Sequence, residues 1–123
     1  MNMSAPKTGL LPSVNPLFAS IEQAQIQLRD VVSTTPLSVN VNLSEEFQAN
    51  ILLKREDLQV VRSYKIRGAH NKISSLEQSE KHQGIICASA GNHAQGVAYS
   101  CQLLKIHGKI YMPKTTPKQK IKQ

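Results

Sequence analysis

The chain has 123 residues, of which 15 are basic and eight are acidic, and it contains two cysteines and no tryptophan. This length suits one domain, and no apolar run approaches the ~20 residues that a membrane-spanning helix needs. Two cysteines are too few for a disulfide scaffold, and no histidine or cysteine lies at zinc spacing from them, so we expect a cytoplasmic protein without a metal site.

The net charge of +7 is concentrated in the last third of the chain. Residues 1–80 hold eight basic and eight acidic side chains, whereas residues 81–123 hold seven lysines and no carboxylate. Such asymmetry fits a tail that faces nucleic acid or membrane, or a chain that stops before its acidic counterpart. Tyr111 is the one aromatic residue near the terminal lysines, so we favour a solvated tail over a nucleic-acid site.

The first half of the chain predicts a leader, a helix and two strands. Residues 1–14 are expected to form a flexible leader, and Asn15-Pro16 has the pattern of an N-cap followed by the first helical residue. Apolar residues at spacings of four and three predict a helix that ends near Val32. Alternating apolar residues over 37–43 and the apolar run 51–54 then predict extended segments.

The second half of the chain alternates between helical and strand patterns. Helical spacing covers 66–76 and 94–104, where Gly108 is expected to end the second helix, and short apolar runs predict strands at 85–88 and 109–112. This order predicts the α/β class, with a parallel sheet and flanking helices. A further helix begins at 116–118 and would leave one strand face uncovered, so we expect an incomplete sheet from the N-terminal portion of a longer protein.

Lys65 is the first candidate for chemistry. It lies at the start of a predicted helix, between Arg62 and Arg67. Neighbouring cations and a helix N-terminus both disfavour a further positive charge, so they are expected to make Lys65 a better amine nucleophile and Schiff-base former. The alternative is an ordinary solvated lysine.

The segment from Ala88 to Gly96 is the second candidate. It predicts a strand, a turn of small residues and a helix, which together present backbone N–H groups to an anion. The alternative is a plain tight turn, with Gly91 at positive φ and Asn92 as the helix cap. Cys87 and Cys101 are predicted to be small core residues rather than reactive thiols.

Two motifs together carry a family resemblance. The segments KREDLQVVRSYKIRGA and CASAGNHAQGVAYS closely resemble the N-terminal part of the threonine dehydratases (threonine ammonia-lyases), which are fold type II pyridoxal-phosphate enzymes of the tryptophan synthase β-like group. The similarity runs from about Thr35 to Thr116, with both motifs in order. The glycine-rich loop that grips the cofactor phosphate in this family would lie beyond residue 123.

The resemblance implies roles for individual residues of the site. It implies that Lys65 bonds covalently to pyridoxal phosphate and is the catalytic base, that Tyr64 packs near the cofactor ring, and that Asn92 binds the cofactor's 3-hydroxyl. It also implies that the loop holds the substrate carboxylate, through Ser89, Ala90, Gly91, Asn92 and His93. Related serine racemases carry a second serine where this chain has Ala90, so elimination is favoured over racemisation.

The resemblance implies deamination of L-threonine to 2-oxobutanoate and ammonia in isoleucine biosynthesis. L-Serine is the alternative substrate, a catabolic dehydratase the alternative enzyme, and a non-catalytic fragment or binding protein the alternative from another class. We expect the complete protein to be a homo-oligomer without nucleic-acid or membrane partners, and this portion alone to be inactive.

Overall fold

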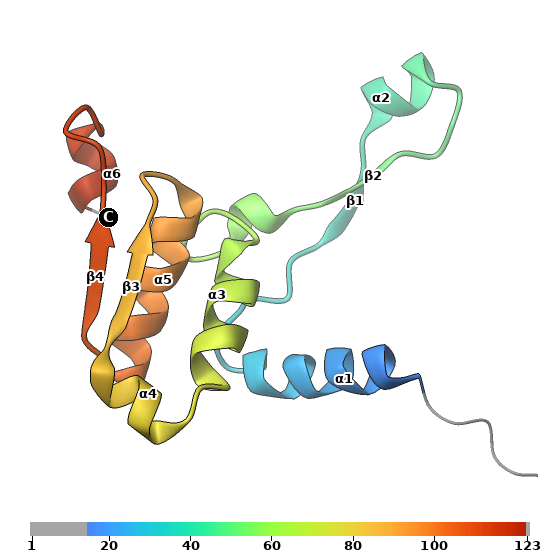
Figure 1. Ribbon diagram of the computed structural model, residues 1–123. Coiled ribbons are helices and arrows are strands. Elements are labelled where there is room, and N and C mark those ends of the chain that lie inside the picture. Colours follow the sequence, from blue (N-terminus) through green and yellow to red (C-terminus); the bar gives the residue numbers. More distant parts are fainter. Residues whose placement is uncertain (1–14, 123) are drawn as a thin grey trace, which may run out of the picture.

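A computed structural model describes residues 15–122, so the predicted leader, residues 1–14, lies outside the described part of the chain (Figure 1). The elements in chain order are α1 (Pro16–Leu28), β1 (Leu37–Val39), α2 (Val41–Glu46), β2 (Leu52–Lys54), the 3₁₀ turn η1 (Glu56–Leu58), α3 (Lys65–Ser74), α4 (Gln78–Gln83), β3 (Ile85–Ala88), α5 (Asn92–Leu104), β4 (Gly108–Tyr111) and α6 (Lys118–Lys122). The α/β class predicted from the sequence is confirmed. None of the helices between residues 15 and 122 has the length and apolarity required to cross a membrane.

The core lies where α3 packs against α5. Ala69 and Ile73 of α3 meet Val97 and Cys101 of α5, and each of these four residues is at most 6% exposed. Partly buried residues of β3, β4 and the end of α5 pack against this cluster. The helical spacing in the sequence predicted the buried faces of both helices correctly, because the same apolar residues line the interface.

The strands form two separate pairs. β3 and β4 are parallel, with Ile85 opposite Gly108 and Ala88 opposite Tyr111, and α5 connects them as a βαβ unit. β1 and β2 are antiparallel, with Leu37 opposite Lys54, and therefore differ from the parallel arrangement expected for the chain. In Figure 1 this antiparallel pair and α2 project away from the body formed by α3, α5, β3 and β4.

Helix α1 begins as predicted, but it ends earlier and is less buried. The Asn15 side chain accepts a hydrogen bond from Leu17 N, and Pro16 is the first helical residue. The helix ends at Leu28 rather than near Val32, and Leu28 is its one buried residue. Ile21, on the predicted apolar stripe, is 56% exposed.

Two capping residues differ from the expectations. The alternation over 37–43 ends after three residues, because Asn40 accepts a hydrogen bond from Leu43 N and starts α2 instead of a longer strand. Gly108 does not end α5 but begins β4, and α5 ends at Leu104, followed by the C-cap Lys105, whose backbone is left-handed with φ of 54°. A left-handed C-cap normally carries glycine, which the sequence pattern placed three residues too late.

Candidate active site

Lys65 is the first residue of α3 and borders an open cavity. Its ammonium group lies 4.8 Å from the centroid of the Tyr64 ring, as expected for a cation–π contact. The cavity has a volume of about 370 Å³ and is lined by Tyr64, Lys65, Lys72, His93 and mostly apolar residues of α3, β3 and α5. The structure therefore places an amine beside an apolar space.

The beginning of α5 lies directly against the backbone of Lys65. A Cβ atom placed on Gly96 would be 3.0 Å from the Lys65 carbonyl oxygen and 3.3 Å from Ala69 Cβ, which is closer than ordinary contacts. Gly96 is buried in the first half of α5, where glycine costs about 1 kcal/mol of helix propensity. The missing side chain is therefore what lets the two helix starts approach each other.

The loop of small residues joins the carboxyl end of β3 to the N-terminus of α5. Ser89 N donates a hydrogen bond to the Tyr111 carbonyl, which extends the pairing of β3 with β4. Gly91 N donates to Ser89 Oγ at 3.3 Å, so this hydroxyl folds back on its own loop. Gly91 is the N-cap with φ of −120°, and Asn92 is the first residue of the helix, so the expected alternative of a positive φ at Gly91 with Asn92 as the cap is wrong.

The predicted site residues fall into two adjoining groups. Lys65, Tyr64 and His93 line the same cavity. Ser89, Ala90, Gly91 and Asn92 lie just before His93, at the start of α5, but do not line this cavity. Asn92 is exposed, whereas Ser89, Ala90 and Gly91 are half-buried. Because a helix leaves its first backbone N–H groups without intrahelical partners, the start of α5 presents N–H groups next to His93, which lines the cavity.

A partly buried ion pair lies on the opposite side of the start of α3. Arg67 donates two hydrogen bonds to the Glu56 carboxylate, from Nε at 2.7 Å and from Nη2 at 2.8 Å. The hydrogen bonds from Arg67 are the main reason that the pKa of Glu56 falls to about 2, although burial opposes the fall. Arg67 is therefore not the uncompensated cation beside Lys65 that the sequence suggested.

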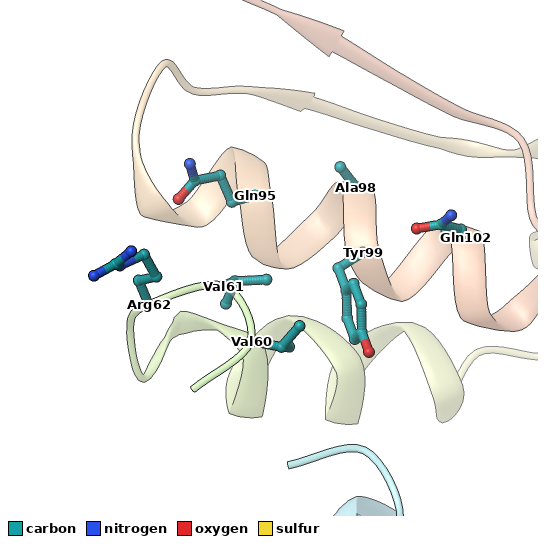
Figure 2. A pocket seen from close by; sticks show the side chains of 7 residues that line it. All are labelled: Val60, Val61, Arg62, Gln95, Ala98, Tyr99 and Gln102. Carbon is teal, nitrogen blue, oxygen red and sulfur yellow. The ribbon is translucent and has the colours of Figure 1, made fainter. Parts of the chain in front are cut away.

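A second cavity, of about 260 Å³, lies between the segment 60–62 and α5. Figure 2 shows Val61 pointing toward α5 and Tyr99 extending from α5 toward Val60. The Arg62 side chain points outward, away from Val60 and Tyr99. None of the predicted site residues lines it. We therefore assign the site to the cavity that contains Lys65.

The surroundings of the other titratable side chains in the core, Cys87, Cys101 and His70, do not favour their reactive forms. Burial raises the pKa of both Cys87 and Cys101, which disfavours the nucleophilic thiolate. His70 is 4% exposed, burial lowers its pKa, and its Nδ1 has no hydrogen-bond partner. Between residues 15 and 122, no group of three or more histidine, cysteine and carboxylate residues could hold a metal ion.

The class of protein follows from a match between this chain and a known protein family. Residues 28–123 match the family described as pyridoxal-phosphate dependent enzymes, and the chain belongs to this family. Pyridoxal phosphate is accordingly its cofactor. The resemblance drawn from the two sequence motifs is confirmed.

Within this family, the chain is most informatively compared with individual relatives of known name. The chain is 58% identical over 103 residues to the biosynthetic L-threonine dehydratase of Bacillus subtilis, covering 84% of this chain and 24% of that protein. It is 50% identical over 113 residues to the enzyme of the same name from Mycobacterium tuberculosis, covering 89% of this chain and 26% of that protein. The chain thus spans about a quarter of the length of the relatives that it matches.

Solved structures show the same fold. The processed form of threonine deaminase isoform 2 from Solanum lycopersicum superposes with a TM-score of 0.76 at 43% identity, covering 89% of this chain and 32% of that one. Maize serine racemase superposes with a TM-score of 0.78 at 31% identity, covering 85% of this chain and 32% of that one. Fold type II therefore describes this chain as well.

The residues present fit the cofactor of the family. The aldehyde of pyridoxal phosphate needs an accessible amine, and Lys65 borders an open cavity with an apolar wall suited to an aromatic ring. A Cβ atom placed on Gly68, which also lines the cavity, would meet nothing within 4 Å, so the space beside Lys65 is open. The Asn92–His93 helix start offers N–H groups to an anion.

Sequence reasoning missed two features of this site. It did not single out Gly96, although a glycine inside a helical pattern signals a close backbone approach. It also missed the pairing of Glu56 with Arg67, because the two residues lie 11 positions apart and no periodicity connects them.

Proposed function

We propose that the protein containing these residues deaminates L-threonine to 2-oxobutanoate and ammonia with pyridoxal phosphate, in isoleucine biosynthesis. The observation that carries the proposal is Lys65, an amine at a helix start that borders an apolar cavity beside the beginning of a second helix. High identity to biosynthetic L-threonine dehydratases supports threonine as the substrate, with L-serine as the alternative.

Each residue of the proposed site has a task that follows from its chemistry. Pyridoxal phosphate, when bound, forms a Schiff base with an amine and stabilises negative charge at the substrate Cα. Lys65 Nζ holds the cofactor covalently and, once displaced, takes the proton from the substrate Cα. The Tyr64 ring packs near the cofactor ring, and the Asn92 amide donates a hydrogen bond to its hydroxyl.

The loop at the start of α5 is proposed to orient the substrate. Ser89 Oγ and the backbone N–H groups of Ala90, Gly91, Asn92 and His93 bind the substrate carboxylate, which the positive end of the helix also favours. The methyl group of Ala90 cannot exchange a proton, so this position supports elimination rather than racemisation.

We further propose that residues 15–123 form the N-terminal part of a catalytic domain, and that other residues grip the cofactor phosphate. The share of 24% of the Bacillus subtilis relative supports this proposal. A homo-oligomer in the cytoplasm, without nucleic-acid or membrane partners, stays our expectation for the whole protein.

The test combines trapping with turnover. Pyridoxal phosphate is added to the protein, and borohydride reduction followed by peptide mass spectrometry identifies the modified lysine. Lys65 is expected to carry most of the label, whereas Lys72, which lines the same cavity, serves as the internal reference.

Turnover is measured as 2-oxobutanoate release from threonine by the complete polypeptide. Lys65→Ala is expected to abolish it, while Lys120→Ala, on the exposed helix α6, leaves it unchanged. Labelling spread evenly over the lysines, or substantial threonine deamination by Lys65→Ala, would contradict the proposal.

A further inference from the structure

Glu56 lies at the centre of a partly buried polar cluster beside the start of α3. Thr35 Oγ1 donates to Glu56 Oε1 at 2.6 Å, in addition to the two hydrogen bonds from Arg67. Gln59 Nε2 lies 3.3 Å from both carboxylate oxygens. Thr35 and Gln59 are only 4% and 3% exposed, so their contacts with Glu56 are shielded from solvent, whereas the Arg67 side chain is 36% exposed.

Gln59 ties this cluster to the segment that follows α1. Its amide donates to the Ser33 carbonyl and accepts from Ser33 N, both at 2.9 Å. Lys54 Nζ also donates to the Thr35 carbonyl. The cluster of Thr35, Glu56, Gln59 and Arg67, which we call the Glu56 cluster, is therefore fixed to two separate stretches of the chain.

The segment between Gln59 and α3 is linked to Gln59 by a backbone hydrogen bond, which Arg62 N donates to the Gln59 carbonyl at 2.7 Å. Tyr64, the N-cap of α3, makes no side-chain capping hydrogen bond. Arg62 has a left-handed backbone with φ of 56°, a conformation that a side chain with a Cβ adopts only when its surroundings enforce it. Gln59 and Arg67 flank this segment, so the Glu56 cluster holds it at both ends.

Arg67 can fix the start of α3 without entering the cavity. It lies two residues after Lys65, which on a helix is a rotation of roughly 200°, so the two side chains leave the axis on nearly opposite sides. Arg67 accordingly does not line the cavity that contains Lys65. On its other side, the Lys65 backbone is confined by α5 at Gly96.

We propose that Glu56 and Arg67, supported by Thr35 and Gln59, are positioning residues that fix the direction of Lys65 toward the cofactor. The inference rests on the proposed role of Lys65. A planar guanidinium that makes two hydrogen bonds to a carboxylate fixes orientation as well as distance, which a single contact does not. A displacement of about 1 Å at a reacting group is enough to lower its reaction rate severely.

The chain offers a matched control beside the cluster. Arg55 makes the same two-bond contact to Asp57, at 2.8 and 2.7 Å, but both side chains are exposed and neither belongs to α3. Asp57→Asn therefore removes an ion pair of the same geometry, one residue away from Glu56→Gln. A difference in labelling between the two variants therefore reflects the contacts that Glu56 makes with α3, Thr35 and Gln59 rather than the loss of an ion pair as such.

The test uses the full chain, pyridoxal phosphate and borohydride, and measures the ratio of label on Lys65 to label on Lys72. Glu56→Gln is expected to lower this ratio by about tenfold, and Asp57→Asn to leave it as in the wild type. The induced circular dichroism per bound cofactor, which reports its orientation rather than its amount, is expected to change in Glu56→Gln alone.

Thr35→Val and Thr35→Ser keep the test decisive if Glu56→Gln fails to fold. Thr35→Val removes one hydrogen bond to Glu56, whereas Thr35→Ser keeps the hydroxyl and is expected to restore the wild-type ratio and dichroism. Wild-type labelling without preference for Lys65 overturns the proposed function and this inference with it. Preference for Lys65 with unchanged dichroism in folded Glu56→Gln, or in Thr35→Val, overturns the positioning role alone.

Discussion

Replacing Gly96 with alanine tests whether close contact between helix starts holds the Lys65 backbone. The new Cβ would lie 3.0 Å from the Lys65 carbonyl oxygen, 3.1 Å from its carbon and 3.3 Å from Ala69 Cβ. The first two are backbone atoms of α3, which cannot rotate away as a flexible side chain could. The helices must therefore separate by a few tenths of an ångström.

Two opposing terms set the size of the effect. Alanine gains about 1 kcal/mol of helix propensity over glycine, whereas overpacking a well-packed interface costs about 1–3 kcal/mol. We expect Gly96→Ala to lower the free energy of unfolding by about 1 kcal/mol. For a domain of this size that corresponds to a fall in melting temperature of about 3–6 °C.

The matched control is the same substitution in the partner helix. Gly68→Ala also lies inside a helix, but its Cβ would meet nothing within 4 Å, so we expect stabilisation by up to about 1 kcal/mol. Thermal unfolding followed by circular dichroism compares the two variants directly. If Gly96→Ala proves as stable as Gly68→Ala, the close approach does not constrain the start of α3.

Three further predictions concern ionisation and helix ends. The pKa of Glu56 is lowered from 4.5 to about 2, so its contribution to stability is fully present above pH 4.5 and is lost as the pH falls toward 2. This difference in pKa corresponds to about 3 kcal/mol, which the partial exposure of Arg67 reduces to about 1–2 kcal/mol. The free energy of unfolding measured with denaturant should therefore change less between pH 5 and pH 2 in Glu56→Gln than in the wild type. Lys105→Gly should stabilise the chain by about 1 kcal/mol, because glycine adopts the left-handed C-cap without strain, and an unchanged melting temperature would contradict this. Asn40→Ala should destabilise the chain by about 1 kcal/mol through loss of the hydrogen bond from Leu43 N. Asn42→Ala, two residues later in α2, should have little effect.

The sequence was most informative where periodicity and burial agree. The faces of α3 and α5 that pack together carry apolar residues at helical spacing, and the β3–β4 pair has short apolar runs between turn residues. Each signal is local and each is reinforced by the core. For that reason the fold class and the positions of these elements could be predicted.

The first half of the chain was harder to predict because tertiary contacts there are few. Leu17 and Ile21 have the spacing of a buried stripe, yet both are more than half exposed. The 37–43 segment alternates like a strand, but the Asn40 side chain offers a local hydrogen bond that starts a helix. The antiparallel direction of β1 and β2 depends on a long-range pairing that spacing alone does not specify.

The candidate site likewise contains residues that the sequence predicted and residues that it did not. The motifs around Lys65 and Asn92 were found because each is a short continuous segment. Glu56 and Gly96 contact the start of α3 from other elements and belong to neither of the two groups of predicted site residues. Gly96 could have been suspected as a glycine inside a helical pattern, whereas the pairing of Glu56 with Arg67 becomes visible only once distances are known.

The packing of α3 on α5 also has a consequence for synthesis on the ribosome. About 30 residues separate Ala69 from its neighbour Cys101, so at 5–20 residues per second α3 waits roughly 2–6 s before its partner has been translated. During that interval the apolar face of Ala69 and Ile73 has no helix to cover it. The nascent chain therefore exposes this apolar face of the helix that begins at Lys65, and a chaperone would protect it there.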